Sequence, residues 1–205
     1  MTTAQNPTPP PSGWTQMLEQ NPGHSQWYID RFDRMAAEGR DLLGEARFVD
    51  ALAPRQARIM DAGCGPGRHG GWLADRGHTV VGVDGDPALI ETAQARHPNA
   101  RWITQDLAVL DLSDEEPFDV IYSVGNVMTF LHPDTRMEVL TRLFQHLAPQ
   151  GRLITGHQPA RGWSAESIIE DMRSIGFAID VVLGTWDMRP FGPDSDFVIV
   201  IASKH

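Results

Sequence analysis

Residues 59–68 read Ile-Met-Asp-Ala-Gly-Cys-Gly-Pro-Gly-Arg, a short apolar run that passes into glycines at alternate positions. Glycine adopts positive φ angles without strain, and its lack of a side chain lets a ligand approach the backbone closely. The N–H groups at the start of a following helix favour an electron-rich ligand group. The stretch therefore predicts a strand, a turn that binds a ligand, and a helix.

A second apolar run over residues 79–83 ends at Asp84, about 20 residues beyond the glycines. An acidic side chain there can accept hydrogen bonds from both hydroxyls of a ribose, as in dinucleotide-binding folds. The pattern Gly65-x-Gly67-x-x-Gly70 matches the dinucleotide fingerprint, so an NAD(P)-dependent oxidoreductase remains an alternative. Asp61 argues against it, because dinucleotide enzymes normally have an apolar residue there. This acid could instead receive a ligand's ammonium group or the amides of the turn.

Strands and helices are predicted to alternate through the chain. We expect strands over residues 58–62, 79–83, 101–104, 118–124, 152–156, 177–183 and 197–202, and helices over residues 24–38, 44–53, 68–76, 87–96, 134–147 and 164–174. Such alternation predicts a parallel sheet with helices on both faces. The last two strands are joined without a helix and should be antiparallel. The sequence thus predicts a doubly wound α/β fold, with a mostly parallel seven-stranded sheet and one antiparallel strand near the C-terminus.

The chain divides into a tail and one domain. Residues 1–22 include a polar, Pro-rich segment and are expected to form a flexible tail. Residues 23–205 are expected to form a single domain, since a core grows to about 100–200 residues before it splits. Within this domain, residues 23–54 would form an N-terminal helical cap and residues 58–205 the core.

Composition excludes several classes of protein. The chain has 205 residues, with 17 Lys and Arg against 27 Asp and Glu and a formal net charge of −10, which disfavours nucleic acid and anionic lipid as partners. No apolar run approaches the roughly 20 residues of a membrane span, and no secretion signal is evident. Cys64 is the lone cysteine, and no His and carboxylate cluster has metal-ligand spacing. We therefore expect a soluble, cytoplasmic protein without a metal that acts on a small molecule.

The run Asp61-x-Gly63-x-Gly65-x-Gly67, followed by Asp84, Asp106 and the Phe-Asp-Val-Ile of residues 118–121, resembles the class I S-adenosylmethionine-dependent methyltransferases. The resemblance extends from about residue 24 to residue 202. In the turn before the fifth strand, Gln150 stands where this family frequently has glycine. The resemblance implies a Rossmann-like fold, S-adenosylmethionine as the cofactor, and transfer of its methyl group to an acceptor.

The resemblance also implies which residues bind the methyl donor. The backbone of the glycine turn would hold its methionine part, Asp84 its ribose, and Asp106 the amino group of its adenine. Residues 123–127 would line the end that carries the methyl group. The implied donor-binding residues are Asp61, Gly63, Cys64, Gly65, Gly67, Asp84, Gly85, Asp86, Asp106, Leu107, Ser123 and Asn126.

Residues that could handle the acceptor are less distinctive. His132 and His157 follow strands at the expected ligand edge and could take a proton near neutral pH, although a lone histidine in a loop is more often solvated. Arg189, in the loop after the sixth strand, could attract an anionic substrate, with Trp186 beside it. Tyr28 and Arg31 lie within one helical turn and could close the site, although core packing explains Tyr28 about as well. No base is required, because a sulfonium methyl is already activated.

Two subclasses of methyltransferase lack their signatures in this chain. Cytosine C5 enzymes need a cysteine after the fourth strand, and Cys64 lies inside the glycine turn instead. Enzymes that methylate amide nitrogens carry an Asn/Asp-Pro-Pro-aromatic motif, where this chain has Ser-Val-Gly-Asn over residues 123–126. The sequence therefore favours a small-molecule acceptor. A non-catalytic nucleoside-binding module remains a second alternative.

Overall fold

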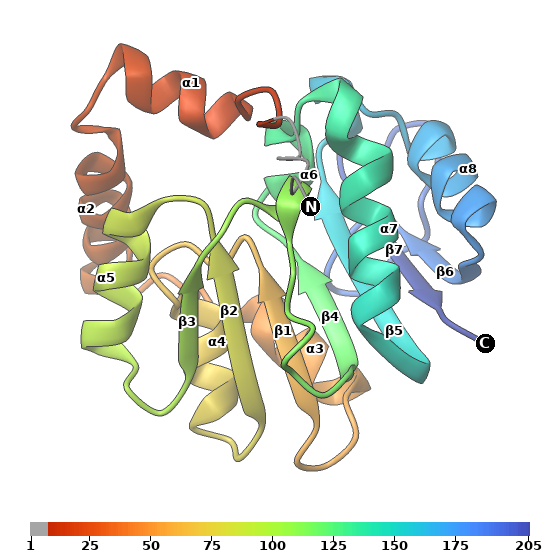
Figure 1. Ribbon diagram of the computed structural model, residues 1–205, viewed down its shortest axis with the longest axis horizontal. Coiled ribbons are helices and arrows are strands. Elements are labelled where there is room, and N and C mark those ends of the chain that lie inside the picture. Colours follow the sequence, from red (N-terminus) through yellow and green to blue (C-terminus); the bar gives the residue numbers. More distant parts are fainter. Residues whose placement is uncertain (1–7) are drawn as a thin grey trace, which may run out of the picture.

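The computed structural model describes residues 8–205, and its centre is a seven-stranded sheet with the order β3-β2-β1-β4-β5-β7-β6 (Figure 1). The strands are β1 (Arg58–Ala62), β2 (Thr79–Asp84), β3 (Arg101–Thr104), β4 (Phe118–Ser123), β5 (Leu147–His157), β6 (Ala178–Leu183) and β7 (Val198–Ser203). The first five strands are mutually parallel, whereas β7 runs antiparallel to both β5 and β6. This arrangement confirms the predicted sheet with one reversed strand.

Helices cover both faces of the sheet (Figure 1). They are α2 (His24–Ala37), α3 (Gly44–Leu52), α4 (Arg68–Ala74), α5 (Pro87–Arg96), α6 (Val127–Phe130), α7 (Arg136–His146) and α8 (Ala165–Ile175), with short 3-10 helices η1 (Leu107–Val109), η2 (Pro133–Thr135) and η3 (Pro159–Arg161). Successive strand residues point to opposite faces. Ile59 accordingly packs in the cluster with α3 and α4, and Met60 in the cluster with α7 and α8.

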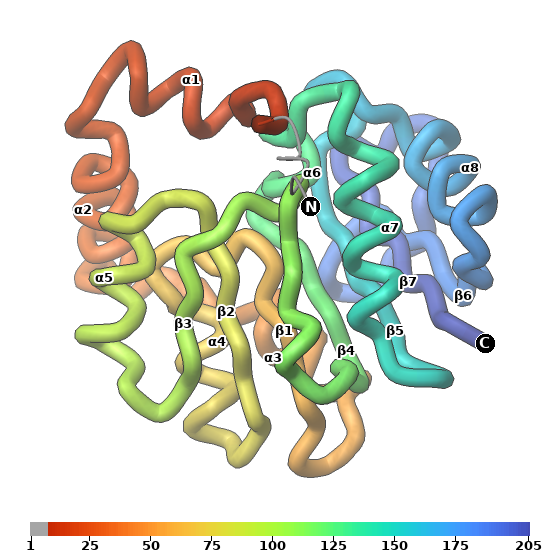
Figure 2. The backbone as a smooth tube through the Cα atoms, in the orientation of Figure 1, coloured from red at the N-terminus to blue at the C-terminus, as the bar shows by residue number. Residues whose placement is uncertain are grey.

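The N-terminal segment differs from the prediction of a flexible tail over residues 1–22. Residues 1–7 lie outside the described part, but Gly13–Gln20 form a helix, α1, capped by the Ser12 hydroxyl. Trp14 Nε1 donates to Asp86 Oδ2 at 2.9 Å, and this buried anchor explains why a short polar segment is ordered. The backbone trace shows α1 crossing above the carboxyl ends of the strands, from α2 toward α6 (Figure 2).

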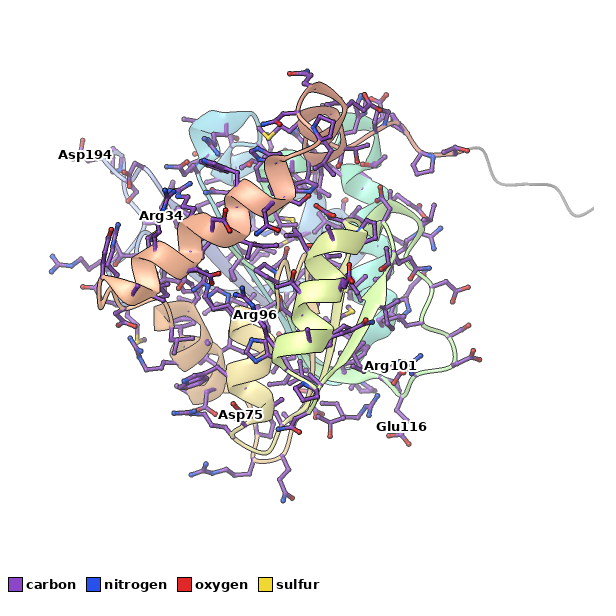
Figure 3. All side chains as sticks on the ribbon, turned by 90° about the vertical axis from the view of Figure 1, so that its left-hand side faces the viewer. Arg34, Asp75, Arg96, Arg101, Glu116 and Asp194 are labelled. Atoms are coloured by element: carbon purple, nitrogen blue, oxygen red, sulfur yellow. The ribbon has the colours of Figure 1, made fainter. Side chains whose placement is uncertain are left out.

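Helices α2 and α5 are joined at the surface by an ion pair. Arg96 on α5 donates to both carboxylate oxygens of Asp33 on α2, at 2.7 and 2.8 Å. The pair lies on the side of the molecule that Figure 3 turns toward the viewer, where Arg96 is labelled. It fixes α2, and with it Tyr28, beside the sheet.

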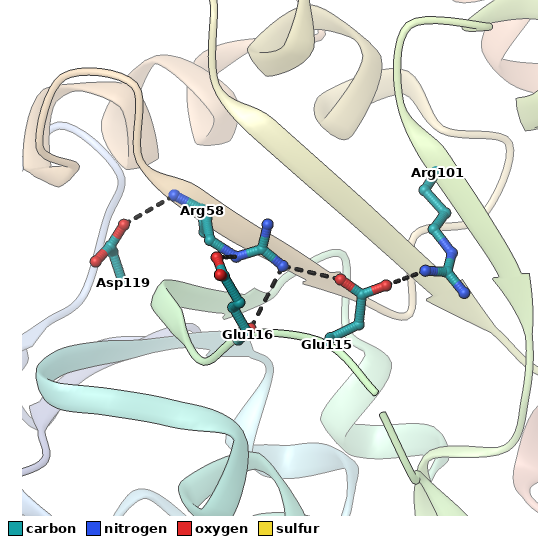
Figure 4. Close-up of polar contacts among 5 residues, drawn as sticks. All are labelled: Arg58, Arg101, Glu115, Glu116 and Asp119. Carbon is teal, nitrogen blue, oxygen red and sulfur yellow. Dashed lines mark hydrogen bonds and ion pairs between the residues drawn. The ribbon is translucent and has the colours of Figure 1, made fainter. Parts of the chain in front are cut away.

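At the opposite end of the strands, charged side chains form a network (Figure 4). Glu115 lies between two arginines: its Oε2 accepts from Arg58 Nη2 at 2.8 Å, and its Oε1 pairs with Arg101. The Asp119 carboxylate accepts from the backbone N–H of Arg58 at 2.8 Å. These contacts tie the segment before β4 to the starts of β1 and β3.

None of the helices within residues 8–205 is long and apolar enough to cross a membrane.

Candidate functional site

A cavity of about 220 Å³ lies at the carboxyl ends of the central strands, beneath α1. One side, the strand-end wall, consists of Gly63, Gly65, Asp84, Gly85, Leu89, Asp106, Leu107 and Gly125. The other side, the helix wall, consists of Ser12, Trp14, Thr15, Leu18, Tyr28, Val127, Phe130 and Leu131. Ligands of open α/β sheets bind outside the carboxyl ends of the strands, which is where this cavity lies.

Most amides of the glycine turn already have partners inside the protein. The N–H groups of Gly63 and Cys64 donate to the Val83 carbonyl at 2.8 and 3.0 Å. The Gly65 N–H donates to Asp84 Oδ2 at 2.8 Å, and the Gly67 N–H donates to the Cys64 carbonyl. The sequence had suggested that these amides are free to donate to a ligand, but each of them already donates within the protein. What the turn offers a ligand is the open space beside Gly65.

Gly63 and Gly65 are required for different reasons. Gly63 has a φ of +84°, and a Cβ there would lie 2.6 Å from Val127 Cγ1, so the glycine lets α6 lie against the turn. Gly65 has a φ of +54° and faces open space, with Tyr28 Cε1 the nearest atom at 3.8 Å from its virtual Cβ. The space above Gly65 is thus available to a ligand.

Cys64 and Gly67 lie behind the turn rather than in the cavity wall. Cys64 is buried beside Trp102, and burial raises the pKa of its thiol well above the usual value. A Cβ on Gly67 would lie 2.8 Å from the ring of Trp102. Both residues therefore pack the turn onto β3 and α5.

Asp84 ends β2 and faces the cavity. Its Oδ2 accepts from the Gly65 N–H and its Oδ1 from the Asp86 N–H at 2.9 Å, so one lone pair on each oxygen is used. Burial raises the pKa of this carboxyl to about 6, although the two N–H donors oppose the shift. The remaining lone pairs of the Asp84 carboxylate can accept hydrogen bonds from a ligand in the cavity.

Asp61 lies beneath the glycine turn and does not line the cavity. It is 2 % exposed, and burial raises the pKa of its carboxyl against the opposing effects of His69 and Tyr122. Tyr122 is its neighbour in register on β4. The side chain therefore supports the turn from the interior rather than reaching a ligand directly.

Asp86 is an anchor between helices. Its Oδ2 accepts from Trp14 Nε1 and from Ser25 Oγ at 2.5 Å, and its Oδ1 caps α5 through the Ala88 N–H. The carboxylate thus holds α1, α2 and α5 together. It does not line the cavity, whereas the adjacent Gly85 does.

Asp106 and Leu107 line the cavity at the end of β3. Asp106 Oδ1 accepts from the Ala108 N–H at 2.8 Å and caps η1, which leaves Oδ2 for a ligand. Ser123 and Asn126 do not line the cavity. Ser123 donates to the Ala62 carbonyl at 2.8 Å, and Asn126 Oδ1 accepts from the Gln158 N–H at 2.9 Å.

Of the candidates for handling the acceptor, only Tyr28 lines the cavity. His157 is fully buried, with Nε2 at 2.9 Å from the Trp163 carbonyl, and burial lowers the pKa of its imidazole. His132 caps η2 through the Asp134 N–H. Arg31 is exposed and stacks over Trp27, with its guanidinium 5.6 Å from the ring centroid.

Trp186 and Arg189 lie away from the cavity. Trp186 packs on Phe48 and Phe197, and a Cβ on Gly156 would lie 2.6 Å from its ring. Arg189 is exposed and donates to Asp187 at 3.1 Å. Trp186 therefore packs the loop after β6 onto α3 and β5, and neither residue lines the cavity at the strand ends.

Most of the residues that sequence reasoning missed belong to the helix wall, of which only Tyr28 and Val127 were predicted. Trp14, Thr15 and Leu18 were assigned to the tail, although Ser12 followed three residues later by Thr15 is an N-cap signal. Helix α6 has only four residues, so it carries no periodic pattern that could have revealed it.

Within residues 8–205, no three side chains of His, Cys, Asp or Glu are grouped so as to hold a metal ion.

Comparisons with known proteins agree with this geometry. A family model described as a methyltransferase domain matches residues 59–151. A crystal structure of a TehB-like SAM-dependent methyltransferase from Corynebacterium glutamicum superposes with a TM-score of 0.87 and 43% identity, covering 90% of this chain and all of that one.

Curated relatives share the same region. A trans-aconitate 2-methyltransferase from Variovorax paradoxus is 37% identical over 67% of this chain and 49% of its own length. One from Delftia acidovorans is 30% identical over 78% of this chain and 56% of its own length. The chain thus spans about half the length of the curated relatives it matches. With the full-length match to the Corynebacterium glutamicum structure, the chain belongs to the family of S-adenosylmethionine-dependent methyltransferases.

Proposed function

We propose that this protein transfers a methyl group from S-adenosylmethionine to a small-molecule acceptor. The observation that carries the proposal is the two-sided cavity. The strand-end wall presents Asp84 and Asp106, and the helix wall faces it with apolar and aromatic side chains. A donor on the first wall would therefore meet an acceptor held against the second.

The strand-end wall fits the adenosine part of the donor. Asp84 has a lone pair left on each oxygen for the two ribose hydroxyls, because each oxygen accepts only one backbone N–H. Asp106 Oδ2 can accept from the adenine amino group, and Leu89 and Leu107 supply apolar surface for its ring. The missing side chain at Gly65 leaves room above the turn.

When bound, the donor would supply an electrophilic methyl group: the acceptor's lone pair would form the new bond to carbon as the S–CH₃ bond breaks, its electron pair would remain on the sulfur as a neutral thioether, and any acceptor proton would pass to solvent. The chain's own residues hold and align the two partners and exclude water, which can account for a large part of a rate enhancement. The Tyr28 ring lies nearest the open side of Gly65, with Cε1 at 3.8 Å from the virtual Cβ. Burial raises its phenol pKa, so it is protonated at neutral pH and acts as a hydrogen-bond partner rather than a base.

The net charge of the chain and the cover that α1 provides over the cavity indicate which partners the protein binds. Helix α1 covers the cavity, which favours a compact acceptor over a polymer. The net charge of −10 disfavours a nucleic acid partner. We accordingly propose a small-molecule acceptor and a cytoplasmic location.

Calorimetric titration with S-adenosylhomocysteine tests the donor site directly. We expect one S-adenosylhomocysteine site per chain. NADH should give no heat of binding, whereas the dinucleotide alternative requires NADH to bind. Absence of binding at millimolar S-adenosylhomocysteine would contradict the proposal. A second assay mixes the protein and S-adenosylmethionine with each of a panel of small nucleophiles and measures the S-adenosylhomocysteine formed. Donor binding with no turnover of any acceptor would favour the non-catalytic module.

A further inference from the structure

We infer that the acceptor is a compact molecule with an apolar body and an uncharged nucleophilic group, and that carboxylate-bearing acceptors are rejected. The inference rests on the proposed function and narrows its substrate class. It follows from the distribution of charge and hydrogen-bonding groups over the two walls of the cavity.

The helix wall carries no charge. Among the described residues that line the cavity, the ionised groups are Asp84 and Asp106, both on the strand-end wall, and no Lys, Arg or His is present. Leu18, Val127 and Phe130 make much of the opposite surface apolar. A carboxylate on the acceptor would lose its water without gaining a cation and would face two negative groups, which is the costly arrangement for a buried charge.

The polar groups of the helix wall are largely satisfied within the protein. Ser12 Oγ and Thr15 Oγ1 lie 3.0 Å apart and share one hydrogen bond, which leaves one hydroxyl proton of the pair available. Trp14 Nε1 donates to Asp86. The Tyr28 hydroxyl, which has no hydrogen bond to another described residue, also remains for the acceptor. These neutral hydroxyls suit a neutral nucleophile better than several carboxylates.

The arginines nearest this region are engaged elsewhere. Arg68 donates to the Leu42 carbonyl and lies over the Phe32 ring, 4.7 Å from its centroid. Arg31 lies over Trp27 at the surface. Neither side chain lines the cavity. A tricarboxylate such as trans-aconitate, the compound in the names of the curated relatives, would therefore find no cationic side chain in the wall of the cavity.

Matched pairs of acceptors test the inference. Each pair shares a ring and a nucleophile and differs in one group: 4-methylaniline with 4-aminobenzoate, and 4-methylphenol with 4-hydroxybenzoate. The readouts are the rate of S-adenosylhomocysteine formation and calorimetric binding to the protein loaded with S-adenosylhomocysteine. We expect the uncharged member to be preferred by about 100-fold, and no binding or turnover of trans-aconitate. Equal or reversed preference within the pairs, turnover of trans-aconitate, or no binding of either uncharged member would overturn the inference.

A positive charge introduced into the helix wall should weaken the preference for the uncharged acceptor. Leu18→Arg places a guanidinium in the cavity, whereas Met17→Arg adds the same charge on the exposed face of α1 and serves as the control. We expect Leu18→Arg to reduce the preference for the uncharged member about tenfold and Met17→Arg to leave it unchanged. An equal effect of both variants would show that net charge, not the wall, sets the preference.

The donor titration separates the two proposals. Loss of S-adenosylhomocysteine binding in the unmodified protein contradicts the proposed function itself. Normal S-adenosylhomocysteine binding with a preference for carboxylate-bearing acceptors contradicts only the inference about the acceptor.

Discussion

Acidic side chains have different kinds of partner at the two ends of the parallel strands. At the amino ends, Glu115 is paired with Arg58 and Arg101 (Figure 4). At the carboxyl ends, Asp84 and Asp106 accept from backbone N–H groups and have no cationic partner among the described residues. Two guanidinium groups compensate the charge of Glu115, whereas neutral N–H donors leave the charge of Asp84 and Asp106 uncompensated and able to attract a ligand's donor groups. The difference distinguishes acids that hold the fold from acids that hold a substrate.

The largest expected effect comes from Asp84→Ala. The variant should lower the affinity for S-adenosylhomocysteine about 100-fold or more, because hydrogen bonds to a charged group contribute roughly 1.5–3 kcal/mol each. Isothermal titration calorimetry measures the change. Asp119→Ala, which removes an acid at the other end of the strands, is the control and should leave the affinity unaltered. A similar loss in both variants would show that the two ends do not differ.

Gly63→Ala should destabilise the fold by about 2 kcal/mol and weaken donor binding, because its Cβ would collide with Val127 at a positive φ. Urea unfolding gives the change in the free energy of unfolding. Gly39→Ala is a matched control, since Gly39 has a φ of +73° with nothing within 4 Å of its virtual Cβ. Equal costs in the two variants would mean that backbone strain alone, and not α6, demands a glycine at position 63.

The raised pKa of Asp84 predicts that donor affinity falls as the pH is lowered through about 6, by roughly tenfold at one unit below, because the protonated carboxyl loses its charge. Folding stability should change in the other direction. The folded protein binds this proton more tightly than the unfolded chain does, so the contribution of Asp84 is present at low pH and is lost as the pH rises through about 6. Calorimetry from pH 5 to 8 checks the first effect. Asp84→Asn should abolish it, and persistence of the slope in that variant would assign it to another group.

The smallest effect is expected from Glu115→Ala, which leaves Arg58 without its side-chain partner. We expect a loss of about 1 kcal/mol in the free energy of unfolding and no change in donor affinity. Glu116→Ala, whose carboxylate is largely exposed and lies 3.9 Å from Arg58, should change neither quantity. Thermal unfolding measures the difference. Weaker donor binding in Glu115→Ala would show that the amino ends also act on the cavity.

The strand-end wall could be predicted from sequence because its residues occupy fixed places in a regular pattern. A strand followed by alternating glycines identifies Gly63 and Gly65, and an acid at the end of the next strand identifies Asp84. The alternation of strands and helices was sufficient to predict the sheet and its reversed strand. In each case a local signal and the global fold agree.

Apart from Tyr28 and Val127, the helix wall could not be predicted, because its residues depend on tertiary contacts. Trp14 is ordered by Asp86 from the β2–α5 corner, and α6 is seated on Gly63. The same reason applies to Trp186, which was predicted for the acceptor pocket: its ring packs on Phe48 and Phe197 and does not line the cavity. Neither periodicity nor composition reveals which distant partner a single aromatic side chain will meet.

The contact between Trp14 and Asp86 joins residues 72 positions apart in the chain. Helix α1 therefore leaves the ribosome before β2 and α5, and it acquires its docking surface only after β2 and the start of α5 have been synthesised. The roof of the cavity is thus made before the surface that holds it in place. Contacts of such long range form late and open early, so amide hydrogen exchange should be faster in α1 than in β1.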